Sequence, residues 1–308
     1  MAALLEIEGL TKTYAGGVRA LDGLSVTCEP GTIGLVGANG AGKSTLFRIL
    51  LGQTQPDEGS VRVAGIDVGV DPIGVRSRLG FMPEHDCLPT DQTAADAVSM
   101  LGEIAGLPAR AARQRASDVL DLVGLDEARF RPIEGFSTGM RQRAKLAQAL
   151  VADPDLVLLD EPTAGLDPAG RLEMLELVRR LGRFGISVVM ATHLLDDVQT
   201  TCDQIVMIDG GRLVASGRTD SLLETTGLVR IDVGGHGDRL LEVLGQQAQL
   251  LADGSVELPV ADEDALDAVV AAVAGAGLPL HSLSSRRATL DGLFLPPEPR
   301  HETGGVPS

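Results

Sequence analysis

Short apolar runs alternate with amphipathic segments through about residue 210. The runs 32–36, 156–159 and 186–191 are mainly apolar, which is typical of strands buried on both faces of a parallel sheet. Segments with apolar residues at helical spacing follow two of them, at 172–183 and 194–201. Strands that alternate with helices predict an α/β fold with a largely parallel or mixed sheet.

The rest of this region contains further strands and a mainly helical insertion. Strands are expected at 4–8, 24–28, 61–63 and 204–209. The insertion spans about residues 84–152, and helices are expected within 93–123 and at 141–151. Gly102, Gly106 and Pro108 interrupt the first of these helical segments. We therefore expect the insertion to form a helical lobe of its own.

After about Gly227 the pattern changes to short strands mixed with two helices. Strands are expected at 228–233, 247–251, 255–260 and 280–283, and helices at 238–244 and 262–274. This order, βαββαβ, is that of a small ferredoxin-like α+β module. We therefore expect two domains, 1–226 and 227–295, followed by a disordered tail at 296–308.

Composition and charge exclude some partners. The 308 residues carry 43 acidic and 26 basic side chains, a net charge of −17, which argues against nucleic acid and anionic lipid. The longest uncharged apolar stretch, 268–280, is too short to span a bilayer, and the N-terminus lacks the pattern of a signal peptide. Cys28, Cys87 and Cys202 are widely spaced and odd in number, which favours free thiols in a reducing compartment. The chain is expected to be soluble and cytoplasmic unless a partner recruits it.

Residues 37–45 read Gly-Ala-Asn-Gly-Ala-Gly-Lys-Ser-Thr and fit the phosphate-loop spacing G-x-x-x-x-G-K-[ST]. Glycines let several backbone N–H groups turn toward a phosphate, and the helix expected to begin at Gly42 adds the positive end of its dipole. Lys43 is expected to reach the β- and γ-phosphates, and Ser44 to offer its hydroxyl to Mg²⁺. An ordinary Gly-rich turn is the alternative. The expected nucleotide-binding residues are Gly37, Ala38, Asn39, Gly40, Ala41, Gly42, Lys43, Ser44 and Thr45.

Two acids, Asp160 and Glu161, follow the apolar strand 156–159 directly. An acid at the end of a strand beside a phosphate loop can hold Mg²⁺, and we expect Asp160 to do so. Glu161 would then lie near the γ-phosphate, where it could polarise an attacking water. Acidic loops after strands are common, so this pair by itself also fits a loop without function.

Two further segments carry candidate chemistry. Phe136–Arg143 is a small polar turn that opens a basic helix, where Ser137 and Gly139 could bind a second anion. A simple helix cap by Ser137 or Thr138 is the alternative. His193 follows the strand 186–191 in the sheet of the phosphate loop, and this position favours a functional role over a structural one.

In this order the motifs resemble those of the nucleotide-binding subunit of ABC transporters. The resemblance covers about residues 4–220. The matching segments are the phosphate loop, Phe81–Glu84, Phe136–Met140, Leu158–Pro162, Gly165–Asp167 and Thr192–His193.

The resemblance implies a head-to-tail dimer that holds two ATP molecules. Each ATP lies on the phosphate loop of one subunit and is covered by the signature segment of the other, which is Phe136–Met140 here. Ser137, Thr138, Gly139 and Met140 would therefore act in trans. The resemblance also implies Tyr14 stacked on adenine, Glu161 as general base, His193 beside the γ-phosphate and the attacking water, and Asp167 at the dimer seam.

The chain departs from the usual family pattern at several positions. Phe136, Thr138 and Met140 replace three residues of the usual Leu-Ser-Gly-Gly-Gln signature. Glu84 stands where the family usually has Gln; its oxygen could still meet Mg²⁺ or water, but it adds charge. Together with the short C-terminal module, these departures resemble the ABC-2 exporter branch, as does the segment 287–295.

The resemblance implies an ATPase motor at the cytoplasmic face of the membrane that drives a separate transmembrane permease. The segment 85–100 is where this permease would dock; an ordinary surface loop is the alternative. A soluble ABC ATPase of the repair or regulatory type is a second hypothesis, but the chain lacks room for a long coiled coil before Ser137. Translation factors of this family carry two cassettes, and a subunit that only binds ATP would be expected to lack Glu161 and His193.

Overall fold

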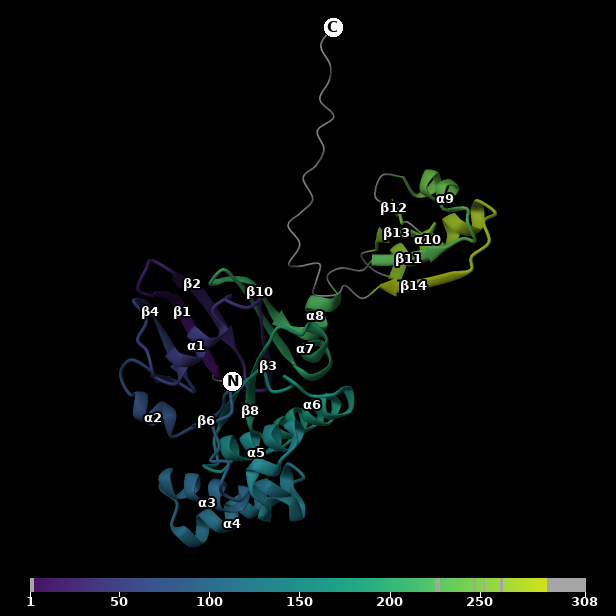
Figure 1. Cartoon of the computed structure of the whole chain (residues 1–308). Helices are drawn as coiled ribbons and strands as arrows, with labels where there is room; N and C mark the ends of the chain where they lie inside the picture. The colour runs from purple at the N-terminus through teal and green to yellow at the C-terminus, as the bar shows by residue number, and fades with distance from the viewer. Residues whose placement is uncertain (1–2, 225–227, 246–247, 252, 261–262, 287–308) are drawn as a thin grey trace. The chain divides into compact units, whose positions relative to one another are not determined.

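The computed structural model describes residues 3–224, 228–245, 248–251, 253–260 and 263–286. The chain divides into two compact units, Met1–Arg218 and Thr219–Ser308, each described by itself below (Figure 1). The predicted closing segment 287–295 and the tail 296–308 lie outside the described residues. Within the described residues, no helix is both long enough and apolar enough to cross a membrane.

A six-stranded mixed sheet forms the centre of the first unit, in the order β10-β9-β3-β8-β7-β6. All neighbours are parallel except β9 and β10. Every residue of β3 and β8 is buried, which explains their nearly continuous apolar sequences. The strands are β3 (Thr32–Val36), β6 (Leu79–Met82), β7 (Leu156–Asp160), β8 (Ser187–Thr192), β9 (Gln204–Asp209) and β10 (Arg212–Arg218).

A second, antiparallel sheet of four strands lies in the same unit, in the order β2-β1-β4-β5. Helix α1 (Lys43–Leu50) contributes Leu46, Phe47, Ile49 and Leu50 to a core cluster that contains residues of both sheets. Helix α1 is therefore packed into a core shared with both sheets, and this packing fixes the end of the phosphate loop that precedes it. The strands are β1 (Leu5–Thr13), β2 (Arg19–Cys28), β4 (Glu58–Val63) and β5 (Ile66–Asp67), and a short helix α2 (Pro72–Arg76) follows.

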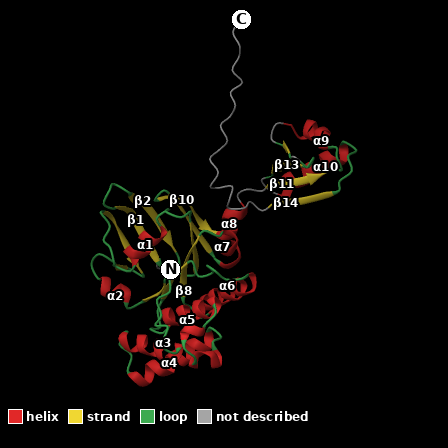
Figure 2. Ribbon diagram, in the orientation of Figure 1, coloured by secondary structure: helices red, strands yellow, loops and turns green. Residues whose placement is uncertain are grey.

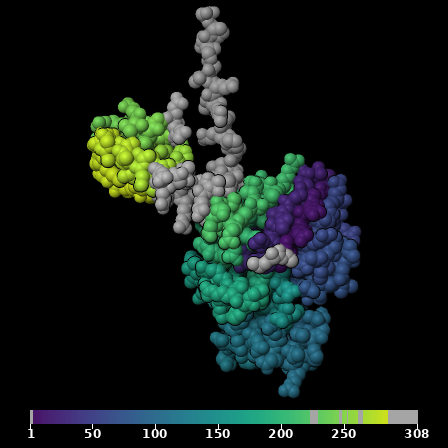
Figure 3. Space-filling view, turned by 180° about the vertical axis from the view of Figure 1, so that it is seen from behind, coloured from purple at the N-terminus to yellow at the C-terminus, as the bar shows by residue number. Residues whose placement is uncertain are grey.

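The predicted insertion forms a helical lobe, the group of red helices below the sheets in Figure 2. It contains α3 (Ala94–Ile104), α4 (Ala109–Leu122), η1 (Asp126–Phe130), η2 (Ile133–Gly135) and α5 (Thr138–Leu150). The predicted breaks at Gly106 and Pro108 separate α3 from α4, whereas Gly102, also predicted as a break, lies buried within α3. Figure 3, seen from behind, shows the lobe at the bottom of the view, below the purple and blue strands of the antiparallel sheet. Two more helices, α6 (Pro168–Arg183) and α7 (Leu195–Thr201), pack on the central sheet.

The second unit contains α8 (Thr219–Glu224) and the predicted βαββαβ order. Its strands form an antiparallel sheet in the order β12-β13-β11-β14, which is ferredoxin-like, and Val229, Ile231, Val256 and Val273 belong to its separate core. The mixed α/β fold and this α+β module confirm the predicted fold class. The elements are β11 (Leu228–Asp232), α9 (Gly237–Leu244), β12 (Gln249–Leu250), β13 (Val256–Pro259), α10 (Glu263–Gly275) and β14 (Ser282–Arg286).

Candidate functional site

The phosphate loop lines a cavity of about 380 Å³ at the carboxyl end of the central strands. The acids that follow β7 and the histidine that follows β8 line the same cavity, so segments far apart in the sequence meet there. Val18, Ala20 and Ala164 also line it and were not predicted. The predicted residues on its wall are Tyr14, Ala38, Asn39, Gly40, Gly42, Lys43, Ser44, Thr45, Glu84, Asp160, Glu161 and His193.

The loop approaches its neighbours too closely for side chains at two of its glycines. A Cβ on Gly37 would come within 2.4 Å of the Ile208 carbonyl oxygen, and one on Gly42 within 2.5 Å of the Ala20 carbonyl oxygen. Gly42 also has φ +113° and caps α1. Gly37 and Ala41 are buried behind the loop. The loop shape therefore depends on glycine at both ends of its tight turn.

Lys43 lies between the loop and the acids. Its ammonium donates to the carbonyl oxygens of Gly37 and Ala38, and its side chain is largely buried. Burial lowers the pKa of Lys43, while the carboxylates of Glu161, Asp160 and Glu84 act in the opposite direction. Three carboxylates thus lie close enough to the Lys43 ammonium to stabilise its charge.

The acids themselves repel one another. Burial raises the pKa of Asp160, and the neighbouring carboxylates of Glu84 and Glu161 raise it further. Lys43 offsets part of this repulsion, and a further cation that enters the site would offset more of it. The hydroxyl-bearing Ser44 is exposed to the same cavity, so oxygen donors suited to a hard divalent cation converge there.

Glu161 is fixed in a strained backbone conformation. Its φ is +47°, which is unfavourable for a residue with a side chain, and its N–H donates to the Ala191 carbonyl at 2.9 Å. Its carboxylate accepts from the Thr192 hydroxyl at 3.2 Å and lies 3.0 Å from Nδ1 of His193. Only 8% of Glu161 is exposed. The carboxylate is therefore held from two sides at the edge of the cavity.

The signature residues lie elsewhere on the chain. Ser137, Thr138, Gly139, Met140 and Asp167 line a separate hollow at the N-termini of α5 and α6. Ser137 accepts from the Met140 N–H at 3.3 Å, and Asp167 from the Gly170 N–H at 2.8 Å, so both are helix caps. A single chain does not bring these residues to the phosphate loop.

Sequence reasoning missed a buried network behind the loops that carry Glu161 and His193. Asp197, 1% exposed, accepts from the Thr163 hydroxyl at 2.8 Å and from Nε of Arg171 at 2.5 Å. It thereby joins α7, which follows His193, to the loop after Glu161 and to α6. An acid on the buried side of α7, beside Val198 and Thr201, is the pattern that could have revealed it.

Known proteins resemble this chain in sequence and in fold. Residues 21–164 match the family model described as ABC transporter. The daunorubicin resistance ATP-binding protein DrrA3 of Streptomyces coeruleorubidus is 36% identical over 305 residues, which cover 94% of each chain. The chain belongs to the ABC transporter family. A Nod factor export ATP-binding protein I of Ralstonia nicotianae is 37% identical to this ABC transporter chain, over 71% of it and 68% of that protein. The structure of cbiO1 from Clostridium perfringens, part of an ABC transporter complex, has a TM-score of 0.67 and 28% identity, and covers 72% of this chain and 91% of its own.

The family assignment confirms the resemblance found in the sequence. As an ABC transporter ATPase, the chain binds and hydrolyses ATP, and the alternative of a soluble ATPase outside transport is not favoured.

Replacing Lys43 with Ala is expected to weaken ATP binding by about 10-fold or more, because hydrogen bonds to charged groups contribute roughly 1.5–3 kcal/mol. Titration with a fluorescent ATP analogue measures the change. Arg48→Met is the matched control, because it removes an exposed cation from the same helix and should leave affinity within about two-fold. Equal affinity for the Lys43→Ala and parent proteins would contradict a phosphate role for Lys43.

Proposed function

We propose that this chain is the ATP-hydrolysing subunit of an exporter, that two copies work head to tail, and that they drive a separate transmembrane permease. The separation of the phosphate-loop cavity from the signature hollow carries this proposal. The phosphate-loop cavity contains Lys43 and the acids, whereas the signature hollow contains the N-terminus of α5. Each therefore supplies half of a nucleotide site. Head-to-tail pairing places the signature hollow of one copy over the phosphate loop of the other and closes both half-sites together.

In the closed pair, donors would surround the γ-phosphate from both copies. Lys43 approaches it from the cradle, and Ser137 with the Gly139 N–H approaches it from the other copy at a helix N-terminus. Closure excludes water other than the attacking molecule, and Asp167 would lie at the seam between the copies. Tyr14, whose ring centroid lies 6.0 Å from the Lys12 ammonium, lines the cavity, where it would stack on adenine.

The donor set fits Mg²⁺. No cluster of three His, Cys, Asp or Glu side chains suited to a metal occurs in the described ranges of the chain. Mg²⁺ usually takes one or two carboxylates and completes its shell with substrate phosphates and water. Ser44, Thr45, Asp160 and Glu84 lie where they would hold the ion or its waters, and the ion would neutralise charge on the β- and γ-phosphates.

Glu161 and His193 would act on the attacking water. Glu161 is held by Thr192 and by His193, so its carboxylate has little freedom to turn away from a water near the γ-phosphate. The position of Glu161 suits a general base that removes a proton from that water. His193, whose side chain is 52% exposed, extends into the cavity, where its other ring nitrogen can meet the γ-phosphate.

The exporter assignment is supported by relatives that are named for daunorubicin resistance and for Nod factor export. We propose that a groove in the helical lobe receives the permease, which would bring this chain to the cytoplasmic face of the membrane. Thr93, Ser99 and Met100, which belong to the segment 85–100, line this groove. Arg113 and Phe130, which lie outside that segment, also line it. Met100 is 39% exposed and Phe130 58% exposed. Exposed apolar side chains among polar and charged ones suit a short amphipathic helix of a partner protein.

The double substitution Met100→Glu and Phe130→Asp is expected to abolish membrane association while the ATPase rate of the isolated protein stays within about two-fold. Co-expression with a candidate permease, followed by sedimentation of membranes, measures the association. Ile73→Asp is the control, because it places a charge at an exposed apolar position on α2, outside the lobe. Retained association of the double variant would exclude this groove as the docking surface.

A further inference from the structure

One face of α5 contacts the loop that follows β6, which we call the β6 loop (Glu84–Cys87). The central contact is made by Lys145, whose ammonium donates to the carbonyl oxygens of Glu84 at 2.7 Å and His85 at 3.3 Å. Both hydrogen bonds go to backbone atoms, so they fix the path of the loop whatever the side chains of Glu84 and His85 do.

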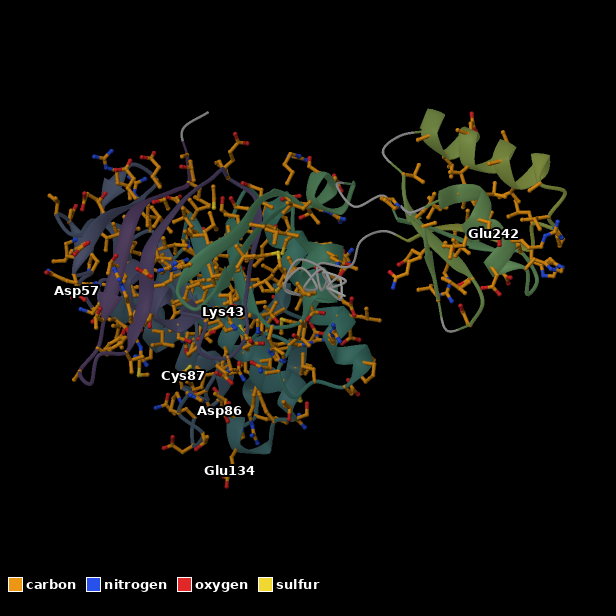
Figure 4. The ribbon with its side chains drawn as sticks, turned by 90° about the horizontal axis from the view of Figure 1, so that it is seen from above. Lys43, Asp57, Asp86, Cys87, Glu134 and Glu242 are labelled. Atoms are coloured by element: carbon orange, nitrogen blue, oxygen red, sulfur yellow. The ribbon has the colours of Figure 1, made fainter. Side chains whose placement is uncertain are left out.

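Two more side chains of α5 lie on the same face. Arg141, four residues before Lys145, lies 3.8 Å from a carboxylate oxygen of Asp86. Gln148, three residues after it, accepts a hydrogen bond from the thiol of Cys87 at 3.3 Å. Spacings of three and four residues place side chains in one row along a helix. Figure 4 labels Asp86 and Cys87, the outer two partners of this row, beside each other on the β6 loop.

Lys145 is an unexpected residue at this position. It is only 2% exposed, and burial lowers the pKa of its ammonium. A buried cation costs free energy that an apolar side chain of similar length would not. The chain has only three lysines, Lys12, Lys43 and Lys145, and uses Arg elsewhere. Two of the three are buried, one beneath the phosphate loop and one beneath the β6 loop.

The two ends of this contact belong to different half-sites. Helix α5 begins at Ser137, whose hollow would cover the nucleotide of the other copy. The β6 loop carries Glu84, which lines the cavity for the chain's own nucleotide. A helix is stiff along its axis, so a contact two turns from Ser137 can transmit a movement of the helix to the loop.

We propose that Lys145 is a positioning residue that locks the β6 loop to the signature helix, so that Glu84 and Ser137 move together. Closure over the partner's nucleotide then also sets the position of Glu84 in the chain's own site. The lock itself depends only on contacts within one chain, whereas its effect on turnover rests on the proposed two-copy site.

Cys87 provides a native reporter of this lock. It is exposed, whereas Cys28 and Cys202 are buried, and burial raises the pKa of Cys28 to about 11. The reaction rate of the folded, full-length protein with N-ethylmaleimide at fixed pH therefore reports Cys87, and Cys87→Ser should remove the fast phase. Burial raises the pKa of Cys87 and the nearby Lys145 charge acts in the opposite direction, so loss of the charge alone would raise this pKa further and slow the reaction. Release of the β6 loop from α5 would accelerate the reaction of Cys87 with N-ethylmaleimide.

Lys145→Met is expected to increase the rate at Cys87 by about five-fold or more, because a loop freed from the helix opens more often. Arg115→Met is the matched control: Arg115 also donates to a carbonyl near the end of α5, that of Leu150, but does not contact the β6 loop. It should leave the rate within about two-fold. An unchanged or slower reaction of folded Lys145→Met would overturn the proposal. If this variant does not fold, Lys145→Gln, whose shorter and uncharged side chain replaces the ammonium that donates to both carbonyls, must still show a faster reaction.

Nucleotide binding and turnover separate the lock from a general defect. Lys145→Met should bind ATP within about two-fold of the parent, since Lys43 is untouched, and its kcat should fall about 10-fold. Faster labelling of Cys87 with normal kcat would support the contact between Lys145 and the β6 loop but overturn its effect on turnover, whereas the two-copy site itself is tested separately by mixed dimers. A loss of ATP affinity as large as the loss of kcat would overturn the positioning role.

Discussion

Replacing Glu161 with Gln is expected to lower ATP turnover by about 100- to 10,000-fold, the range typical for loss of a general base. Gln has nearly the shape of Glu but cannot take a proton from water. Its amide can still accept from the Thr192 hydroxyl and meet His193, so the strained loop should keep its form. Removal of a negative charge close to the γ-phosphate should leave ATP affinity equal or somewhat higher. Phosphate release under saturating ATP, with a parallel binding titration, measures both quantities.

The same substitution at an unrelated carboxylate tests the specificity of this effect. Glu176 lies on α6 and forms surface ion pairs with Arg179 and Arg183. Glu176→Gln should therefore change turnover by less than about two-fold. If Glu161→Gln hydrolyses ATP at the parent rate, Glu161 is not the base. If it loses ATP binding instead, its role is in the nucleotide cradle.

The parts of the site that were predictable from sequence depend on local chemistry. A tight turn with inward N–H groups needs glycines at set spacing, and an apolar strand that ends in acids needs no distant residue to be recognised. For this reason the run at Gly37–Thr45 and the pair Asp160 and Glu161 could be placed before the fold was known. The structure brings them to one cavity, as parallel strands with a common carboxyl edge require.

Features that depend on tertiary contacts were not predictable. Strand β6 has only four residues and was not predicted. The predicted strand 204–209 ends before two glycines, and β10, which follows them, was also missed. Lys145 lies in an ordinary amphipathic helix, and only the fold shows that its ammonium meets backbone carbonyls on the β6 loop. The residues alone indicated an anion site at Ser137; its separation from the phosphate loop of the same chain was expected only through the family resemblance, and the structure shows it.

Co-expression of Lys43→Ala and Ser137→Asp chains is expected to restore activity that neither variant has alone. Asp at position 137 keeps the helix cap, since Asp is a favoured N-cap residue, but places a negative charge against the γ-phosphate. In a mixed pair, one site combines both defects, and the other combines the intact Lys43 of one chain with the intact Ser137 of the other. Random pairing makes half of the dimers mixed, so about one quarter of the parent activity should return.

Mixing Lys43→Ala with Glu161→Gln is the control that fixes the geometry. Lys43 and Glu161 line the same cavity of one chain, so a mixed dimer of these two variants contains no intact site. No activity should return in this mixture, although the chains pair as before. Restoration in the first mixture and not in the second requires that Ser137 acts across the dimer while Glu161 acts within its own chain. Equal inactivity of both mixtures, with mixed dimers verified by differently tagged chains, would instead place the signature segment and the phosphate loop of one chain on the same nucleotide.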